Sequence, residues 1–273
     1  MSSFPVTLVS CYFPLKNAKY NESTYLKWMK TFLQNVKAPL IVYTTAEFRD
    51  VIENLRGSLP LLVRETTLEK FHVYENLSEF QHSHEIDPEK KIHNTSLYMI
   101  WNEKTSFVKQ EIDNNPYGSK YFFWVDIGCF RDERILHIIT NWPLVERVEY
   151  ETKRKDAVMI LNIDSFTENE LAWKSTSEED LGPNFEKTVR LGGGIFGGSI
   201  DAFNKWHFLY YATLKKYFDA KRFAGKDQNI MATVCLKYPQ TVNLIKIPPE
   251  ASKEGDIWFF MHRFLGEMRY QST

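Results

Sequence analysis

The sequence predicts an α/β protein whose first part is a Rossmann-like, parallel β-sheet. Strand and helix signals alternate from the N-terminus to Arg64, and chains with this alternation form right-handed crossovers and parallel sheets. An apolar run at Tyr121–Val125 stops abruptly at Asp126, as a buried strand does where it reaches a ligand crevice. No repeat, low-complexity segment or linker divides the 273 residues, so we expect one domain with an elaborated second half.

The early elements follow from apolar spacing and from helix-capping residues. In the first helix the aromatic and aliphatic side chains recur at intervals of three and four, and Thr44 or Thr45 can cap the second. Predicted strands occupy residues 6–13, 39–44 and 59–64, and predicted helices occupy residues 21–35 and 46–55. Residues 65–89 carry three histidines among charged and polar residues. We expect a solvated connection there in preference to a metal cluster.

The later elements are predicted in the same way. Asn94 caps a long helix that ends before the stop signal at residues 114–118. A charged stretch at 146–155 receives no assignment, and a polar segment at 167–183 is expected to be a loop with a short helix. Further helices are predicted at 95–113, 133–140, 200–218 and 224–236, and further strands at 121–125, 157–161 and 241–247.

Composition argues against several functional classes. The net charge of −1 gives no reason to expect bulk binding to nucleic acid or to an anionic membrane. Three cysteines, far apart, form neither a disulfide framework nor a zinc cluster. The N-terminal residues lack a signal-peptide pattern, and no run approaches the ~20 apolar residues that span a bilayer. We therefore expect a reduced, cytoplasmic protein without a transmembrane segment. The aromatic share of 15% suits a ligand cleft or simply an aromatic core.

Asp126 is the first candidate site residue. A carboxylate just past a central parallel strand can ligate a divalent cation such as Mn²⁺ or Mg²⁺, or can hold a ribose hydroxyl. The structural alternative is a helix cap for the segment that begins at Arg131.

The glycine-rich stretch at 191–199 is the second candidate. Gly192, Gly194 and Gly197 formally match a dinucleotide fingerprint. No strand that ends in an acid follows at the required distance, so a dinucleotide oxidoreductase is a minor alternative. These glycines would let the backbone approach a sugar or a diphosphate closely, or would form a tight turn or bulge.

Two further candidates lie near the C-terminal end. Asp227 begins a predicted helix and suits a general base or an acceptor for sugar hydroxyls, with plain N-capping as the alternative. His262 follows an apolar run. Its imidazole could complete a metal shell begun by Asp126, although a lone histidine is often structural. Arg263 could counter phosphate charge.

Three segments of the sequence resemble the WlaTC/HtrL (YibB-like) glycosyltransferase family. They are Tyr-Met-Ile-Trp-Asn-Glu-Lys-Thr-Ser-Phe-Val at 98–108, Asn-Pro-Tyr at 115–117, and Phe-Trp-Val-Asp-Ile-Gly-Cys-Phe-Arg at 123–131. The likeness extends from residue 7 through the glycine-rich stretch to Gln228. It implies a GT-A-like fold with a mixed, mainly parallel sheet, and a nucleotide-diphosphate-sugar donor, a UDP-sugar first of all.

The resemblance also assigns roles within the site. The central stretch looks like the Asp-x-Asp motif of GT-A enzymes, in which both carboxylates serve the donor metal. Asp126 matches the first position, but Gly128 stands at the second, which puts the expected cation in doubt. Lys104 resembles a basic residue that contacts the donor. The tail at His262 is similar to a His-x-x-Gly segment that ligates the metal, with a spacing that differs by one residue.

These observations combine into one hypothesis. The chain would be a glycosyltransferase that moves a sugar to a hydroxyl of a glycan or glycoconjugate. Residues 1–132 would bind the nucleotide sugar, and residues 133–273 the acceptor. Asp227 would be the base, and Asp126 and His262 the metal ligands. The donor would contact Ser10, Tyr12, Thr44, Lys104, Asp126, Gly128, Arg131, Gly193, Gly194 and Arg263. The alternative is a non-catalytic carbohydrate- or nucleotide-binding protein with a degenerate GT-A cleft.

Overall fold

The computed structural model describes residues 4–15, 20–253 and 255–270. Its strands form one sheet of seven strands in the order β3-β2-β1-β4-β6-β5-β7. The first four of these are mutually parallel, whereas β6 runs antiparallel to both of its neighbours, β4 and β5. The predicted mixed, mainly parallel sheet flanked by helices is therefore confirmed.

The strands are β1 (Val6–Tyr12), β2 (Leu40–Thr44), β3 (Leu61–Glu65), β4 (Tyr121–Val125), β5 (Val158–Asn162), β6 (Leu191–Ser199) and β7 (Val242–Lys246). The helices are α1 (Glu22–Asn35), α2 (Ala46–Arg56), α3 (Leu77–Ile86), α4 (Thr95–Asn114), α5 (Leu136–Ile139), α6 (Val145–Arg154), α7 (Glu168–Ala172), α8 (Ile200–Asp219), α9 (Asp227–Lys237) and α10 (Phe260–Gly266). None of the described helices is long and apolar enough to cross a membrane.

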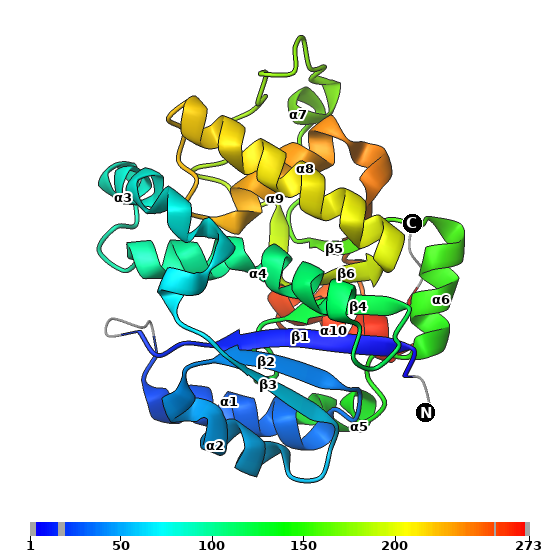
Figure 1. Cartoon of the computed structure of the whole chain (residues 1–273). Coiled ribbons are helices and arrows are strands. Elements are labelled where there is room, and N and C mark those ends of the chain that lie inside the picture. The colour runs from blue at the N-terminus through cyan, green and yellow to red at the C-terminus, as the bar shows by residue number, and fades with distance from the viewer. Residues whose placement is uncertain (1–3, 16–19, 254, 271–273) are drawn as a thin grey trace.

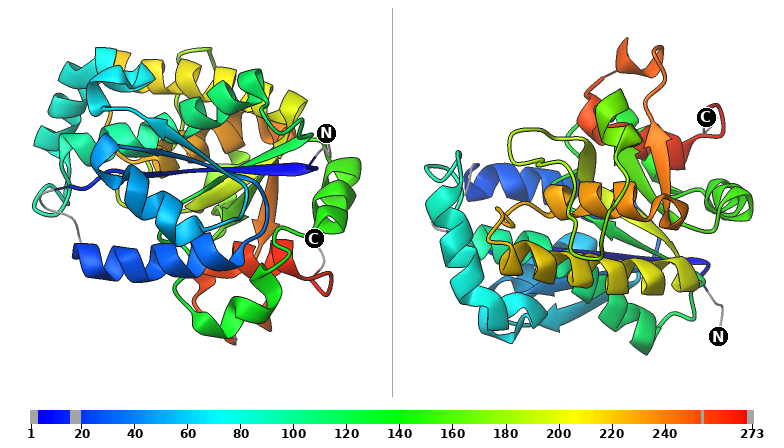
Figure 2. Two further views of the ribbon diagram at one scale, coloured as in Figure 1. Left: turned by 60° about the horizontal axis from the view of Figure 1, so that its bottom comes forward. Right: turned by 90° about the horizontal axis from the view of Figure 1, so that it is seen from above.

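Helices cover both faces of the sheet (Figures 1 and 2). One hydrophobic cluster joins the sheet to α4, α8 and α9, and a second joins its other face to α1, α2 and α10. The central strands β1, β2 and β5 are buried along their whole length, as strands covered on both faces must be. Asn94 caps α4 through the backbone N–H of Leu97, as the sequence predicts, and Asn21 caps α1 through that of Thr24.

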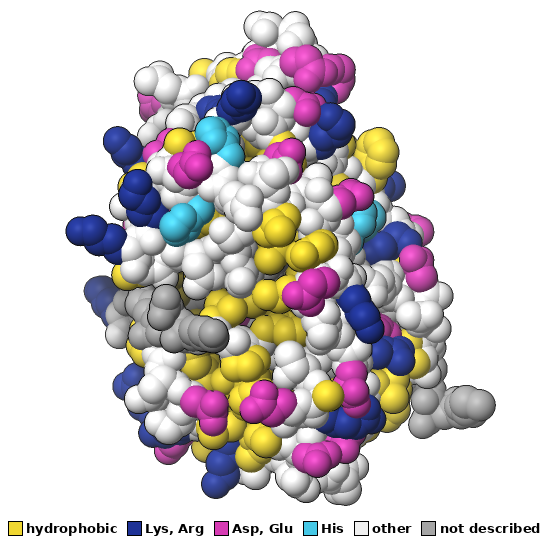
Figure 3. All heavy atoms as spheres, turned by 60° about the vertical axis from the view of Figure 1, so that its left-hand side comes forward, with side chains coloured by type: hydrophobic (Ala, Val, Ile, Leu, Met, Phe, Trp, Pro, Cys, Tyr) yellow, Lys and Arg dark blue, Asp and Glu magenta, His cyan; other side chains and the backbone are white. Residues whose placement is uncertain are grey.

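The strand order of the sheet reverses between β1 and β4. The strands β2 and β3 lie on one side of β1, and β4 lies on the other. The loops that leave the carboxyl ends of β1 and β4 therefore diverge, and ligands of open α/β sheets bind at such a point. In Figure 1 these ends lie toward the left. Figure 3 brings that side forward and shows hydrophobic side chains gathered over its middle, with acidic ones beside them.

One sequence-based expectation about the elements is wrong. Residues 65–89 are not a solvated connection, since they hold α3 and bury Phe71, Val73 and Phe80 in the core. Charged residues between these side chains hide their apolar spacing. The charged stretch 146–155, which the sequence leaves unassigned, is mostly helix α6, which buries Val148. The glycine-rich stretch is a strand, β6, and its register against β5 shifts between Ile160 and Leu161, as at a β-bulge.

Candidate functional site

Asp126 lies directly past the carboxyl end of β4, at the reversal point of the sheet. Its backbone N–H donates to the carbonyl of Gly194 at 2.7 Å, and its carbonyl accepts from Cys129 at 3.0 Å, which fixes the loop. Its Oδ1 accepts a hydrogen bond from Nε1 of Trp124 at 2.7 Å. The alternative of a helix cap does not hold, because Asp132 caps the short 3₁₀ turn that follows.

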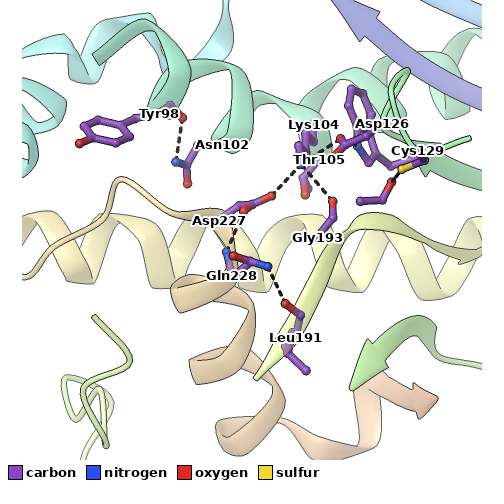
Figure 4. A network of polar contacts seen from close by, with 12 residues as sticks. Tyr98, Asn102, Lys104, Thr105, Asp126, Cys129, Leu191, Gly193, Asp227 and Gln228 are labelled. Carbon is purple, nitrogen blue, oxygen red and sulfur yellow. Dashed lines mark hydrogen bonds and ion pairs between the residues drawn. The ribbon is translucent and has the colours of Figure 1, made fainter. Parts of the chain in front are cut away.

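Lys104 joins Asp126 to the second half of the chain (Figure 4). It projects from the middle of α4, and its side chain is only 4% exposed. Its Nζ lies 3.0 Å from Oδ1 of Asp126 and 3.1 Å from Oδ2 of Asp227. It also donates to the carbonyl oxygen of Gly193 at 3.0 Å. Three oxygen atoms thus surround an ammonium group that has three N–H donors.

Asp227 occupies the first turn of α9, and the side-chain amide of Asn102 fixes the loop that precedes it. Asn102 of α4 donates to the carbonyl oxygens of Ala224 and Gly225, and Tyr210 donates to its Oδ1 at 2.7 Å. Lys226 is the N-cap residue, while Oδ1 of Asp227 accepts from the backbone N–H of Gln228 at 2.9 Å. The carboxylate therefore stabilises the positive end of the helix and still presents Oδ2 to Lys104.

Glycine at two positions of β6 allows this close packing. A Cβ atom at Gly193 would lie 2.8 Å from Oδ2 of Asp227, so only glycine leaves room for that carboxylate. A Cβ atom at Gly197 would lie 2.2 Å from the carbonyl oxygen of Phe122, so glycine there lets β6 approach β4. The glycines thus make room for a carboxylate and a neighbouring strand. Their predicted approach to a sugar or a diphosphate stays a prediction.

The electrostatics of the three charged groups are unequal. Burial lowers the pKa of Lys104, but the charges of Asp126 and Asp227 outweigh burial, so its pKa is raised and it stays protonated. Burial and the charge of Asp126 raise the pKa of Asp227, and Lys104 opposes that rise. Asp227 is 5% exposed and its Oδ2 faces the Lys104 ammonium, whereas Asp126 is 40% exposed. The site therefore has one buried carboxylate and one that is open to solvent.

Arg131 packs against the rings of Trp28 and Phe259, here called the aromatic shelf, beside the Asp126 loop. Its Nε donates to the carbonyl of Gly128 at 2.8 Å, and its guanidinium lies 3.9 Å from the ring centre of Trp28 and 5.0 Å from that of Phe259. The Nη groups form no hydrogen bond or ion pair with the described residues. Arg263, by contrast, is half-buried and reaches the carbonyl of Ala251 at 3.5 Å.

His262 is 1% exposed and stands among aromatic rings. Its ring centre lies 4.2 Å from that of Phe130 and 5.7 Å from that of Phe259. Burial, with a smaller contribution from Arg263, lowers its pKa to about 3, so the imidazole is neutral. Its Nε2 has no hydrogen-bond partner among the described residues.

The donor set around Asp126 does not favour a divalent cation. Oδ1 already accepts from Trp124 and faces the Lys104 ammonium, and Gly128 supplies no side chain. Within residues 4–15, 20–253 and 255–270, no group of three or more His, Cys, Asp and Glu side chains could hold a metal ion. A cation held by Asp126 and His262 stays a prediction that nothing in the structure tests directly.

Three of the residues expected to contact the donor, Ser10, Tyr12 and Thr44, are enclosed by protein. Ser10 and Thr44 are fully buried, and the Thr44 hydroxyl donates to the carbonyl of Tyr12 at 2.8 Å. The Tyr12 ring packs against Phe48 and Tyr25. Their contact with a donor stays a prediction.

A small hollow of about 10 Å³, which has room for about one water molecule, opens beside the site. Its walls come from the Asp126 loop, from β5, from β6 and from the tail, namely Cys129, Leu161, Gly192, Gly194, Ile195, Trp258 and Met261. Trp258 is 47% exposed, and a partly exposed indole suits the apolar face of a sugar ring. A larger open hollow of about 320 Å³ between α3 and the end of α8 contains none of the predicted site residues.

Sequence reasoning missed three residues of the site, namely Trp124, Gln228 and Trp258. Trp124 donates to Asp126, and Gln228 donates to the carbonyl of Leu191 in β6 at 2.7 Å. Gln228 carried a signal, because a polar side chain on the buried face of a helix needs a partner. Trp258 carried none, since a single exposed tryptophan is common.

Comparison with solved structures finds distant similarity in architecture. Mouse xyloside xylosyltransferase 1 in its apo form aligns with a TM-score of 0.46 and 11% identity, covering 97% of this chain and 93% of the other. The 4-diphosphocytidyl-2C-methyl-D-erythritol synthase of Anaerococcus prevotii aligns with a TM-score of 0.39 and 11% identity, covering 96% and 98%. No curated protein matches the sequence. The model of the HtrL_YibB family, bacterial proteins of unknown function, matches residues 5–265, and the chain belongs to that family.

Proposed function

We propose that this protein is a glycosyltransferase that moves a sugar from a nucleotide-diphosphate sugar to a hydroxyl group of a glycan or glycoconjugate. The observation that carries the proposal is the linkage of Asp126 and Asp227 through Lys104 at the reversal point of the sheet. Ligands of α/β sheets bind at this point. An open carboxylate there suits ribose or sugar hydroxyls, and a buried one suits proton transfer.

In the proposed reaction Asp227 is the base. The acceptor oxygen attacks the anomeric carbon while Asp227 takes the hydroxyl proton. The bond between that carbon and the phosphate oxygen breaks, and the nucleoside diphosphate leaves with the electron pair. A raised pKa makes Asp227 a stronger base than an ordinary carboxylate. Arg131, whose Nη groups are available, would stabilise the negative charge that develops on the leaving diphosphate.

Asp126 would orient the donor and Trp258 would contact the transferred or accepting sugar. Asp126 is the more exposed carboxylate, and its loop borders the hollow that Trp258 lines. UDP-sugars are the first donors to screen, because the family resemblance points to them. Thermal shift identifies a donor, since ligands that bind the native state raise its stability.

Two isosteric substitutions test the roles. Asp227→Asn should keep donor binding and lose roughly 10²–10⁴-fold in turnover, the usual contribution of a general base. Asp126→Asn should weaken donor binding itself. Asp132→Asn is the matched control, because this carboxylate pairs with exposed Arg134 outside the site. Turnover that survives in Asp227→Asn would show the base assignment to be wrong.

A non-catalytic binding protein is the second candidate, and one observation favours it. Gly128 leaves the motif with one carboxylate, so the site could have kept binding and lost turnover. Calorimetric binding of a nucleotide sugar without transfer or hydrolysis would support this candidate over the enzyme.

A further inference from the structure

We infer that Lys104 and Arg131 supply the positive charge of the donor site and that the protein binds a nucleoside diphosphate without a divalent cation. This inference rests on the proposed function, because it concerns the same donor. It departs from the two-carboxylate metal site that the sequence resemblance implies. The reason is that the carboxylate of Asp126 already has a cationic partner, Lys104, and a hydrogen-bond donor, Trp124, where a metal ion would otherwise bind.

The first step concerns the charge on Asp126. A donor metal normally neutralises the motif carboxylates, which would otherwise repel the diphosphate. Here the ammonium of Lys104, 3.0 Å from Asp126 and 3.1 Å from Asp227, performs that neutralisation from inside the fold. The Lys104 side chain is 4% exposed and its ammonium also donates to the Gly193 carbonyl, so this positive charge is a fixed part of the fold. A dication on Asp126 would also lie close to this fixed positive charge, and like charges at a few ångströms repel.

The second step concerns the ligands that a dication would need. Mn²⁺ and Mg²⁺ prefer several hard oxygen ligands. Oδ1 of Asp126 has two donors, Trp124 and Lys104, and the residue two positions on is Gly128. A side chain at Gly128 would meet Trp28, since a Cβ there lies 3.3 Å from its ring. The aromatic shelf thus occupies the direction from which a second motif carboxylate would come.

The third step concerns the diphosphate. With Asp126 neutralised by Lys104, a phosphate needs donors of its own, and Arg131 offers them. One N–H of its guanidinium is bonded to the Gly128 carbonyl at 2.8 Å, and its face rests on Trp28 at 3.9 Å. This leaves the Nη edge with no partner among the described residues. An arginine held in this way is preorganised for bidentate bonds to phosphate.

Calorimetric titration of UDP, GDP and CDP, each with EDTA and again with Mn²⁺, tests the inference. The Kd of the diphosphate that binds best should agree within about threefold between the two buffers, a difference of less than 1 kcal/mol. Mn²⁺ titrated alone and followed by electron paramagnetic resonance should show no stoichiometric binding. A diphosphate that binds only when Mn²⁺ is present, or Mn²⁺ that binds alone at one per chain, would overturn the inference and leave the proposed function intact.

Variants separate the role of Arg131 from general structure. Arg131→Met keeps packing on Trp28 and should weaken diphosphate binding in EDTA by about tenfold or more, the loss expected for charged hydrogen bonds. Arg131→Lys should recover part of the affinity. Arg134→Met removes an exposed charge nearby and should bind as the wild type does. Equal affinities for Arg131→Met and wild type would refute the phosphate contact. No diphosphate binding in either buffer would refute the proposed function and this inference with it.

Discussion

Replacing Lys104 with methionine removes the charge that holds two carboxylates together. Methionine preserves most of the aliphatic packing but leaves Asp126, Asp227 and the Gly193 carbonyl without their shared partner. Removing one member of a buried ion pair costs about 3–5 kcal/mol, a large share of a total stability of about 5–15 kcal/mol. At about 2 °C per kcal/mol for a chain of this length, Tm should fall by roughly 6–10 °C.

The loss should depend on pH with a definite sign. Burial raises the pKa of Asp227, and Lys104 is the main group that opposes this rise. Without Lys104 the folded-state pKa rises further. A carboxyl group with a raised folded-state pKa stabilises the fold below its unfolded pKa, about 3.9, and loses that contribution as the pH increases through the folded value. The deficit of Lys104→Met should therefore be largest near neutral pH and should shrink toward about pH 4.

Urea unfolding near neutral pH and near pH 4 measures both effects. Lys109→Met is the matched control on the same helix, since its partner Asp113 is 61% exposed; it should cost less than about 0.5 kcal/mol. The double variant Lys104→Met/Asp227→Asn should recover much of the loss, because the unpaired buried charge is then absent. A Lys104→Met deficit equal to that of Lys109→Met, or one that does not change with pH, would refute the reasoning.

Three further predictions concern a strand contact, a buried imidazole and a surface ring. Gly197→Ala places a Cβ atom 2.2 Å from the Phe122 carbonyl; it should cost more than about 3 kcal/mol, read as low soluble yield or a lower urea midpoint. His262 has a pKa lowered to about 3, so below about pH 6.5 the unfolded chain binds a proton there that the folded protein does not, and wild type loses stability. The free energy of unfolding of His262→Phe should therefore fall by about 2 kcal/mol less than that of wild type between about pH 6.5 and pH 4.5. Trp258→Ala should slow transfer to the acceptor and leave donor hydrolysis and Tm unchanged. The control Phe208→Ala, at a 71% exposed ring of α8, should change neither transfer, hydrolysis nor Tm.

The central strand and its carboxylate were predictable because the information is local. Tyr121–Val125 is a continuous apolar run, and its end at Asp126 is visible in a few letters. The helices with clear caps, α1 and α4, were predictable for the same reason. Local signals of this kind depend on periodicity and capping chemistry, which the neighbouring residues alone decide.

The strand β6 could not be predicted, because its composition contradicts its conformation. Glycine is depleted in strands, and five of the nine residues from Leu191 to Ser199 are glycine. The strand exists because β4 and β5 flank it and because Gly197 lets it approach Phe122. Tertiary contact overrides propensity here. The contacts of Lys104 with Asp126 and Asp227 were hidden for a related reason, since only the fold brings positions 104, 126 and 227 together.

The protein has two kinds of buried ion pair, one with a structural role and one that the proposed function uses. Arg147 and Glu151 are both almost fully buried, and Arg147 also donates to the carbonyl oxygens of Glu267 and Tyr270, so it fastens the C-terminal segment with its donors in use. That arrangement is satisfied and isolated from solvent.

The Lys104 cluster is neither balanced in charge nor isolated from solvent. Two carboxylates share one ammonium, and Asp126 is 40% exposed. Hydrophobic residues of similar volume would often fold as well as a buried ion pair or better, so stability does not account for this cluster. An excess of negative charge with an open side is what the proposed function requires, in which Asp227 takes a proton and Asp126 binds a ligand hydroxyl.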